Sequence, residues 1–156
     1  MIPKPPKRIV LDTNICLDLF VFRDPRWQPL LDAMQAGDVQ AVTRADCRME
    51  WTLVLAYAKL GLDEAAQRAA LGEFDRWITL VDATPIDGLL PVCKDPDDQK
   101  FLELAAASGA TMLLSKDKAL LKLARRTRKL GLFEILSPAQ WVDARCQKPA
   151  AAPTLE

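Results

Sequence analysis

The chain has 156 residues, of which half are hydrophobic, and 21 basic residues balance 21 acidic ones. This length and composition predict one domain with its own core, and no apolar run approaches the ~20 residues that a membrane span requires. The sequence contains no histidine, which excludes Ser-His and Cys-His catalysis and histidine-ligated metal sites, and the zero net charge gives no general argument for nucleic-acid binding.

The first half of the chain alternates short apolar runs with helix-like segments. Residues 1–7 are basic without an apolar stretch behind them, so we expect a disordered leader and no signal peptide. The run Ile9-Val10-Leu11, followed at once by Asp12, predicts a buried strand that carries a carboxylate at its end. The elements expected up to residue 81 are a strand at 9–12, a helix at 15–20 capped by Thr13 or Asn14, a helix at 27–36 ended by Gly37, a strand at 39–42, a helix at 46–59 capped by Thr43 or Asp46 and ended by Gly61, a helix after the cap Asp63 to about residue 77, and a strand at 78–81. In the 46–59 helix the apolar positions include Met49, Leu53, Ala56, Tyr57 and Leu60, close to helical spacing.

Prolines and glycines interrupt residues 82–97, where we expect a loop that crosses the end of the sheet. The elements expected after it are a helix from Asp97 or Asp98 to Ala107 closed by Gly109, a strand at 111–114, a basic helix at 118–130 closed by Gly131, a strand at 133–136 and a short helix at 137–142. The alternation of strands and helices predicts an α/β fold with three layers, in which helices cover both faces of a central parallel sheet of about five strands. We expect the domain to span residues 8–145 and a disordered tail to follow at 146–156.

Acidic residues stand at the ends of several predicted elements. Asp12 ends the first strand, Glu50 lies one turn into the helix after the second strand, and Asp117 follows the fourth strand. Asp98 begins the helix after the loop, and Asp95 in the same acidic run is the alternative candidate for this position of the site. Because strand ends lie along one edge of a doubly wound sheet, these carboxylates can meet there. Carboxylates gathered at one place stay ionised only beside a cation, and oxygen ligands suit Mg²⁺ or Mn²⁺. Two such ions, roughly 3.5–4 Å apart, can cleave a phosphodiester bond without the help of histidine.

Helix capping is the simpler explanation for some of these acids. An aspartate at a helix start commonly only caps the helix, which stabilises it by about 1 kcal/mol. Asp46 and Asp63 fit that explanation best, Asp98 fits either one, and Glu50 alone is typical of a solvated helix face. Asp12 is the hardest to explain in this way, because it directly follows a buried strand.

The cysteines indicate a reducing compartment. Cys16, Cys47, Cys93 and Cys146 are far apart and form no CxxC pair. We therefore expect reduced thiols that mostly fill the core of a cytoplasmic protein, and no structural zinc site.

Four segments carry a family resemblance, which runs from about residue 8 to residue 142. They are residues 10–14 (VLDTN), 48–51 (RMEW), 94–105 (KDPDDQKFLELA) and 114–121 (LSKDKALL). At these segments the sequence resembles the PIN-domain nucleases, and among them the VapC-related toxins of toxin–antitoxin systems. The resemblance implies that the metal-binding catalytic acids are Asp12, Glu50, Asp98 and Asp117, with Asn14 and Ser115 as supporting polar residues.

The resemblance also implies an activity and partners. Members of the family are mostly Mg²⁺- or Mn²⁺-dependent ribonucleases, many form homodimers, and a small antitoxin neutralises the toxins by covering the active site with its C-terminal segment. Lys116 departs from the pattern, because many relatives have a small or amide residue there. We expect its ammonium group near the metal site, where it contacts phosphate or weakens metal binding.

Basic residues crowd the segment 116–129, which contains seven of them against one acid. Lys118, Lys122, Arg125 and Lys129 are spaced i, i+4, i+7 and i+11, which places them on one side of the predicted helix. Together with Lys116 they form a predicted RNA-binding stripe that could follow a phosphate backbone, and a solvated helix face is the alternative. Few aromatic residues accompany the stripe, so it gives no sign of base stacking.

Three alternative functions fit the sequence less well than the nuclease does. A PIN-like module could bind RNA or protein without cutting, although the presence of all four acids favours the enzyme. A haloacid-dehalogenase phosphatase would need a second aspartate where Asn14 stands. A dinucleotide-binding domain would need a glycine-rich turn after the first strand, and the sequence has none there.

Overall fold

In the computed structural model, residues 6–84, 88 and 90–151 are described, with side chains as far as residue 145. The strands are β1 (Lys7–Leu11), β2 (Val39–Thr43), β3 (Ile78–Leu80), β4 (Met112–Leu114) and β5 (Glu134–Leu136). All pair in parallel in one sheet, in the order β3-β2-β1-β4-β5. The predicted parallel sheet of about five strands, and with it the α/β class, is confirmed.

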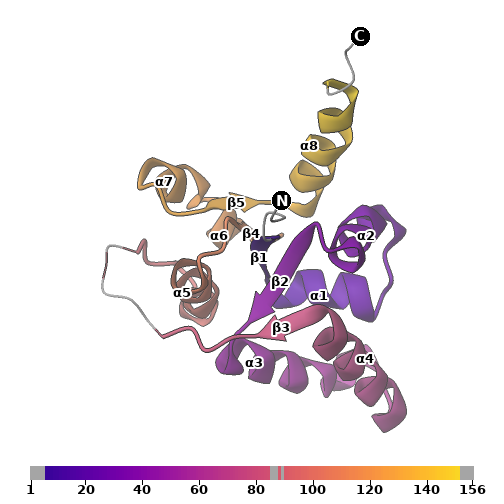
Figure 1. The fold of residues 1–156 in the computed structure, drawn as a ribbon. Coiled ribbons are helices and arrows are strands. Elements are labelled where there is room, and N and C mark those ends of the chain that lie inside the picture. The colour runs from indigo at the N-terminus through magenta and orange to yellow at the C-terminus, as the bar shows by residue number, and fades with distance from the viewer. Residues whose placement is uncertain (1–5, 85–87, 89, 152–156) are drawn as a thin grey trace.

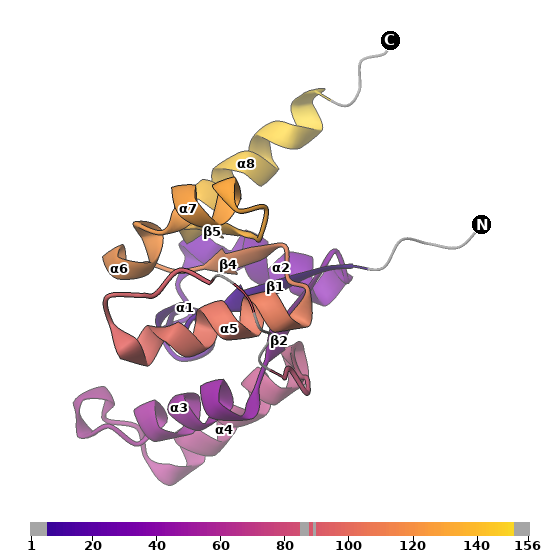
Figure 2. The ribbon, with the colours of Figure 1, turned by 90° about the vertical axis from the view of Figure 1, so that its left-hand side faces the viewer.

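Helices cover both faces of the sheet (Figure 1). On one side lie α5 (Gln99–Ser108), α6 (Lys118–Leu121) and α7 (Ala124–Lys129). On the other side lie α1 (Thr13–Phe20), α2 (Gln28–Ala36) and α8 (Pro138–Ala151). Below them are α3 (Ala45–Leu55) and α4 (Glu64–Trp77), and Figure 2 shows this pair beneath α5. Single 3₁₀ turns occur at Pro25–Trp27, Ala58–Leu60 and Pro96–Asp98.

The central strands are apolar on both faces because both faces are buried. Ile9 and Leu11 of β1 belong to the core under α1 to α4, whereas Val10 between them belongs to the core under α5. Successive side chains of a strand point to opposite faces, and a parallel strand buried on both faces needs apolar residues at each position. The uninterrupted apolar run that identified β1 in the sequence is therefore explained by its central place.

Two predicted helix starts were wrong. Asp12, and not Thr13 or Asn14, is the N-cap of α1, and its side chain accepts a hydrogen bond from the Ile15 amide. At the start of α3 the cap position is Arg44, which makes no capping hydrogen bond with its side chain. The helix also ends at Leu55, so the predicted continuation to residue 59 is a separate 3₁₀ turn that Gly61 closes with φ 65°.

The apolar residues that predicted helix α3 include several that are not in the core. Met49 and Leu53 are each 58% exposed and Tyr57 is 57% exposed, whereas Trp51 and Leu55 are buried. The helix is thus apolar on two sides, and only the side of Trp51 packs against the core around Phe20 and Phe74.

The predicted basic helix at 118–130 is also wrong, because it consists of α6 and α7. The Leu123 amide donates to the carbonyl three residues back, at Leu120, and not four back. Such a 3₁₀ step changes the angle between successive side chains, so spacing in sequence no longer predicts a common face.

Both ends of the chain differ in part from the predictions. Lys7 is already in β1, and residues 1–5 of the expected leader lie outside the described residues. The last helix, α8, continues to Ala151, past the predicted end at 142 and into the expected tail, and residues 152–156 again lie outside the description. In the loop predicted at 82–97, residues 82–84, 88 and 90–95 are neither helix nor strand.

Two further expectations can be compared with the structure. Cys16, Cys47 and Cys93 are free and buried, as predicted, and the side chain of Cys146 is not among those described. None of the helices in the described part of the chain combines the length and the apolar character that a membrane crossing demands.

Candidate active site

The predicted acids lie where the order of the strands reverses. The chain builds β1, β2 and β3 outward in one direction and then returns to place β4 on the other side of β1. Ligands of open α/β sheets bind at such a switch point, outside the carboxyl ends of the strands. Asp12 follows β1, and Ser115 and Asp117 follow β4, so the loops on both sides of this point carry polar side chains.

Asp12 is buried, with 4% of its surface exposed. Its Oδ1 accepts the Ile15 amide at 3.1 Å, and its Oδ2 accepts the hydroxyl of the fully buried Ser115. The pKa of Asp12 is raised to about 6, mainly by burial and also by the charge of Asp117, against the opposing effects of the two hydrogen bonds and Lys116. Ser115 also accepts the Asp117 amide at 2.9 Å, so one hydroxyl links the loops after β1 and β4.

Three further carboxylates form a group beside Asp12. Asp95, Asp98 and Asp117 each offer one carboxylate oxygen, and these oxygens lie within 4.8 Å of one another. The pKa of Asp98 is raised to about 7, first by burial, then by the hydrogen bond and charge of Asp117, and last by the charges of Asp95 and Asp12. Asp98 is the N-cap of α5 but makes no capping hydrogen bond, so capping does not explain it.

The donor set of this group fits a hard divalent cation. Within the described residues, Oδ2 of Asp98 is buried and has no hydrogen-bond partner. A buried carboxylate oxygen without a partner is costly, and carboxylate oxygens are the ligands that Mg²⁺ and Mn²⁺ prefer. The sequence offered Asp98 and Asp95 as alternative ligands for the same position, but the structure places both in the group.

Glu50 lies in the same region but is neutralised by the protein itself. One oxygen, Oε1, is 2.6 Å from the ammonium group of Lys100, and the other accepts the hydroxyl of Thr13. Glu50, Asp12 and Asp98 line one cavity of about 360 Å³. The structure therefore brings Glu50 to the site, although the three-acid group does not include it.

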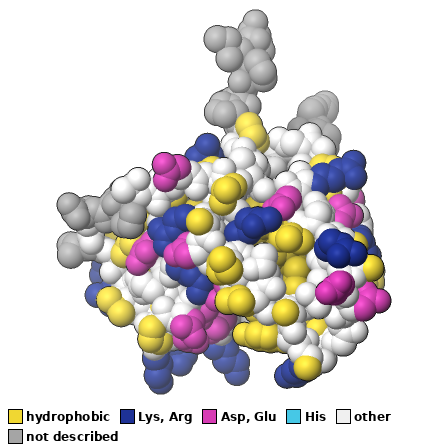
Figure 3. Space-filling view, turned by 90° about the horizontal axis from the view of Figure 1, so that it is seen from below, with side chains coloured by type: hydrophobic (Ala, Val, Ile, Leu, Met, Phe, Trp, Pro, Cys, Tyr) yellow, Lys and Arg dark blue, Asp and Glu magenta, His cyan; other side chains and the backbone are white. Residues whose placement is uncertain are grey.

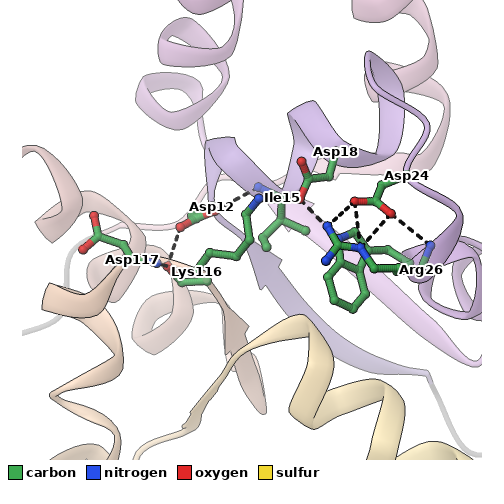
Figure 4. A network of polar contacts seen from close by, with 9 residues as sticks. Asp12, Ile15, Asp18, Asp24, Arg26, Lys116 and Asp117 are labelled. Atoms are coloured by element: carbon green, nitrogen blue, oxygen red, sulfur yellow. Dashed lines mark hydrogen bonds and ion pairs between the residues drawn. The ribbon is translucent and has the colours of Figure 1, made fainter.

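The charge of Lys116 acts on Asp12, so the lysine lies near the site, but its ammonium group is paired with an acid of α1. Its Nζ is 2.6 Å from Oδ2 of Asp18, and Figure 4 shows the side chain reaching from its loop toward α1 and away from Asp117. Asp18 is 7% exposed and also accepts the indole N–H of Trp27 at 3.2 Å. This ion pair is favourable because an unpaired, buried carboxylate would raise the free energy of the folded state.

The supporting and basic residues have mixed outcomes. Ser115 joins Asp12 to Asp117 as described, and Asn14 is exposed and lines the 360 Å³ cavity. The basic stripe of Lys118, Lys122, Arg125 and Lys129 is fully on the surface, but it spans two helices and so does not form one continuous helical face.

The sequence did not reveal three residues of this region. Thr13 and Lys100 both hold Glu50, and Asp18 holds Lys116. The sequence does mark Asp18 as unusual, since it is an acid between Leu17 and Leu19 in an apolar helix. Nothing in the sequence marks Lys100, because its partner is fifty residues away in the chain.

Comparison with known proteins agrees with this geometry. The family model described as PIN domain matches residues 8–119, which is more than half of the chain and includes every acid of the site. No curated protein matches the chain.

Proposed function

The chain belongs to the PIN-domain family, and we propose that it is a ribonuclease that hydrolyses RNA phosphodiester bonds with Mg²⁺ or Mn²⁺. PIN domains are generally metal-dependent nucleases. The observation that carries the proposal is the group of Asp95, Asp98 and Asp117, with an orphaned buried oxygen on Asp98, next to the buried Asp12.

The residues of the site have distinct roles in this proposal. Asp98, Asp117 and Asp12 would hold the cation, with Asp95 at the exposed side of the group. When bound, the cation supplies an acidified water and offsets the charge that develops on the phosphate. Ser115 orients Asp12 and Asp117 together through its single hydroxyl. Thr13 and Lys100 fix the carboxylate of Glu50 at the wall of the cavity.

The test is cleavage of end-labelled single-stranded RNA and of DNA of the same sequence, with Mg²⁺, Mn²⁺ or a chelator. We expect RNA cleavage that requires the metal and falls roughly 100-fold or more in Asp98→Asn, because the substitution removes a ligand. The matched control is Asp143→Asn, an exposed aspartate on α8, which should cleave as the wild type does.

Calorimetry with Mn²⁺ supplies a second measurement. Asp98→Asn should bind the ion more weakly, whereas Asp143→Asn should not. Equal cleavage by the wild type and Asp98→Asn would contradict the proposal. Binding of RNA without cleavage would favour the non-catalytic module, which the pairing of Glu50 with Lys100 also supports.

We further propose that the enzyme is the cytoplasmic toxin of a toxin–antitoxin pair. The support is the resemblance at the four segments, above all in residues 94–105 and 114–121. A small antitoxin would cover the acidic site, and the toxin would form a homodimer, as many relatives do. Growth arrest by the wild type but not by Asp12→Asn would support toxicity, and light scattering of the purified chain would measure the oligomeric state.

A further inference from the structure

The 360 Å³ cavity has an apolar part that the proposed chemistry does not use. Besides Asp12, Glu50 and Asp98, its lining includes two aromatic residues, Phe22, which follows α1, and Tyr57, which follows α3. Both aromatic rings are more than half exposed. Figure 3 shows hydrophobic side chains exposed beside acidic and basic ones on the face that carries α3 and α4.

We propose that this part of the cavity receives one unpaired nucleobase of the substrate, next to the phosphate that is cut, and stacks it on Tyr57 or Phe22. The inference rests on the proposed nuclease function and names the residues that would contact a base of its substrate. A base reaches such a cavity only when it is outside a double helix.

The polarity of the cavity matches the polarity of a nucleotide. Its lining combines carboxylates, which would hold a cation for the phosphate, with two flat aromatic rings. Aromatic side chains stack on any base because every base has a π face. Lys59 lines the same cavity and is exposed, so it can contact a neighbouring phosphate.

The backbone holds both aromatic residues in defined positions. The Tyr57 amide donates to the Val54 carbonyl at 3.0 Å, and the 3₁₀ turn that follows ends at Gly61. The Phe22 amide donates to the Leu17 carbonyl at 2.9 Å. An exposed ring on a fixed backbone is ready to stack at little cost in entropy.

A peptide segment of a protein partner is the competing occupant. Acids and an apolar wall would also accept a peptide with basic and apolar side chains. Lys59 on the wall opposes such a cationic segment, whereas it attracts a phosphate. The observations therefore favour the nucleotide.

The experiment measures binding of fluorescent single-stranded RNA by anisotropy, with Asp98→Asn as the background so that no cleavage occurs. We expect Tyr57→Ala, Phe22→Ala or both to weaken binding about 10-fold, and Tyr57→Phe to retain it, because the ring is kept. Leu80→Ala is the matched control, since this exposed leucine does not line the cavity. The loss should disappear for RNA with an abasic site at the cut position.

The outcomes separate this inference from the proposed function. Unchanged RNA binding by both alanine variants overturns the inference, even if the wild type cleaves RNA. An equal loss for intact and abasic RNA overturns it too. It is also overturned if the alanine variants bind RNA normally but bind a synthetic peptide of alternating lysine and leucine more weakly than the wild type does. If the wild type binds RNA through Tyr57 but does not cleave it, the base pocket is supported and the nuclease proposal fails.

Discussion

Two kinds of acid lie at the same edge of the sheet. Glu50 and Asp18 each have a cation from the chain itself, namely Lys100 and Lys116. The group Asp95, Asp98 and Asp117 has no ion pair within the described residues, and burial raises the pKa of Asp98. The acids that the fold itself uses are neutralised, whereas the three-acid group is left in need of an external cation. The candidate metal site therefore contains fewer acids than lie at this edge of the sheet.

The largest effect on stability is expected from removing the cation of Asp18, the most buried acid among the ion pairs of the described residues. Lys116→Met leaves the carboxylate of Asp18 with only the Trp27 indole as a partner. We expect a loss of about 2 kcal/mol in the free energy of unfolding, less than for a fully buried pair because Lys116 is partly exposed. Urea denaturation at pH 7 measures it. Lys122→Met, on the exposed surface, is the control, and an equal loss in the two variants would show that the pair is not special.

The acids without a cation should behave in the opposite way. The pKa of Asp98 is 3.8 in a model peptide and about 7 in the fold. Between these values the folded state keeps a proton that the unfolded chain has lost, so the stability of the metal-free protein falls as the pH rises through 7. In the presence of a chelator, Asp98→Asn should therefore stabilise the protein at pH 8 by roughly 1–2 kcal/mol, allowing for screening of this partly exposed group.

This gain should shrink as the pH falls and vanish below about pH 3, where the carboxyl group is protonated in both states. Thermal unfolding across the pH range measures it, with Asp143→Asn as a variant in which no such trend is expected. A gain that is the same at pH 4 and pH 8 would mean that the carboxylate is not destabilised by its neighbours.

The strand ends were the part of the site that the sequence could predict. Asp12 and Asp117 follow buried apolar runs, and the parallel sheet then places them at one edge whatever the details of packing. Lys116 could not be placed, because a long flexible side chain goes to the nearest uncompensated charge, and Asp18 is close only in three dimensions. The pairing of Glu50 with Lys100 was hidden for the same reason.

Helix faces show the same limit. Helical spacing correctly indicated a helix at α3, but the helix is apolar on two sides, and spacing alone does not say which side meets the core. The single helix predicted beneath the basic stripe was wrong, because one backbone hydrogen bond, that of Leu123 with Leu120, divides it in two. The sequence also gave no sign of base stacking near the stripe, whereas the exposed residues Phe22 and Tyr57 line the cavity that the acids share.

The smallest effect is expected at Glu50 and Lys100, and a double-mutant cycle with Glu50→Gln and Lys100→Met would measure it. Their side chains are 27% and 19% exposed and 2.6 Å apart. Burial opposes the charge of Lys100, but Glu50 raises the pKa of the ammonium group above its usual value. We expect a coupling free energy of about 1 kcal/mol, since both side chains are only partly exposed to water. The matched control is Glu64 with Arg68 on α4, which are 92% and 75% exposed and 4.0 Å apart, and whose coupling should be about 0.3 kcal/mol. Equal coupling in the two pairs would mean that Lys100 does not serve as the cation of Glu50, and that Glu50 is free to join the metal ligands.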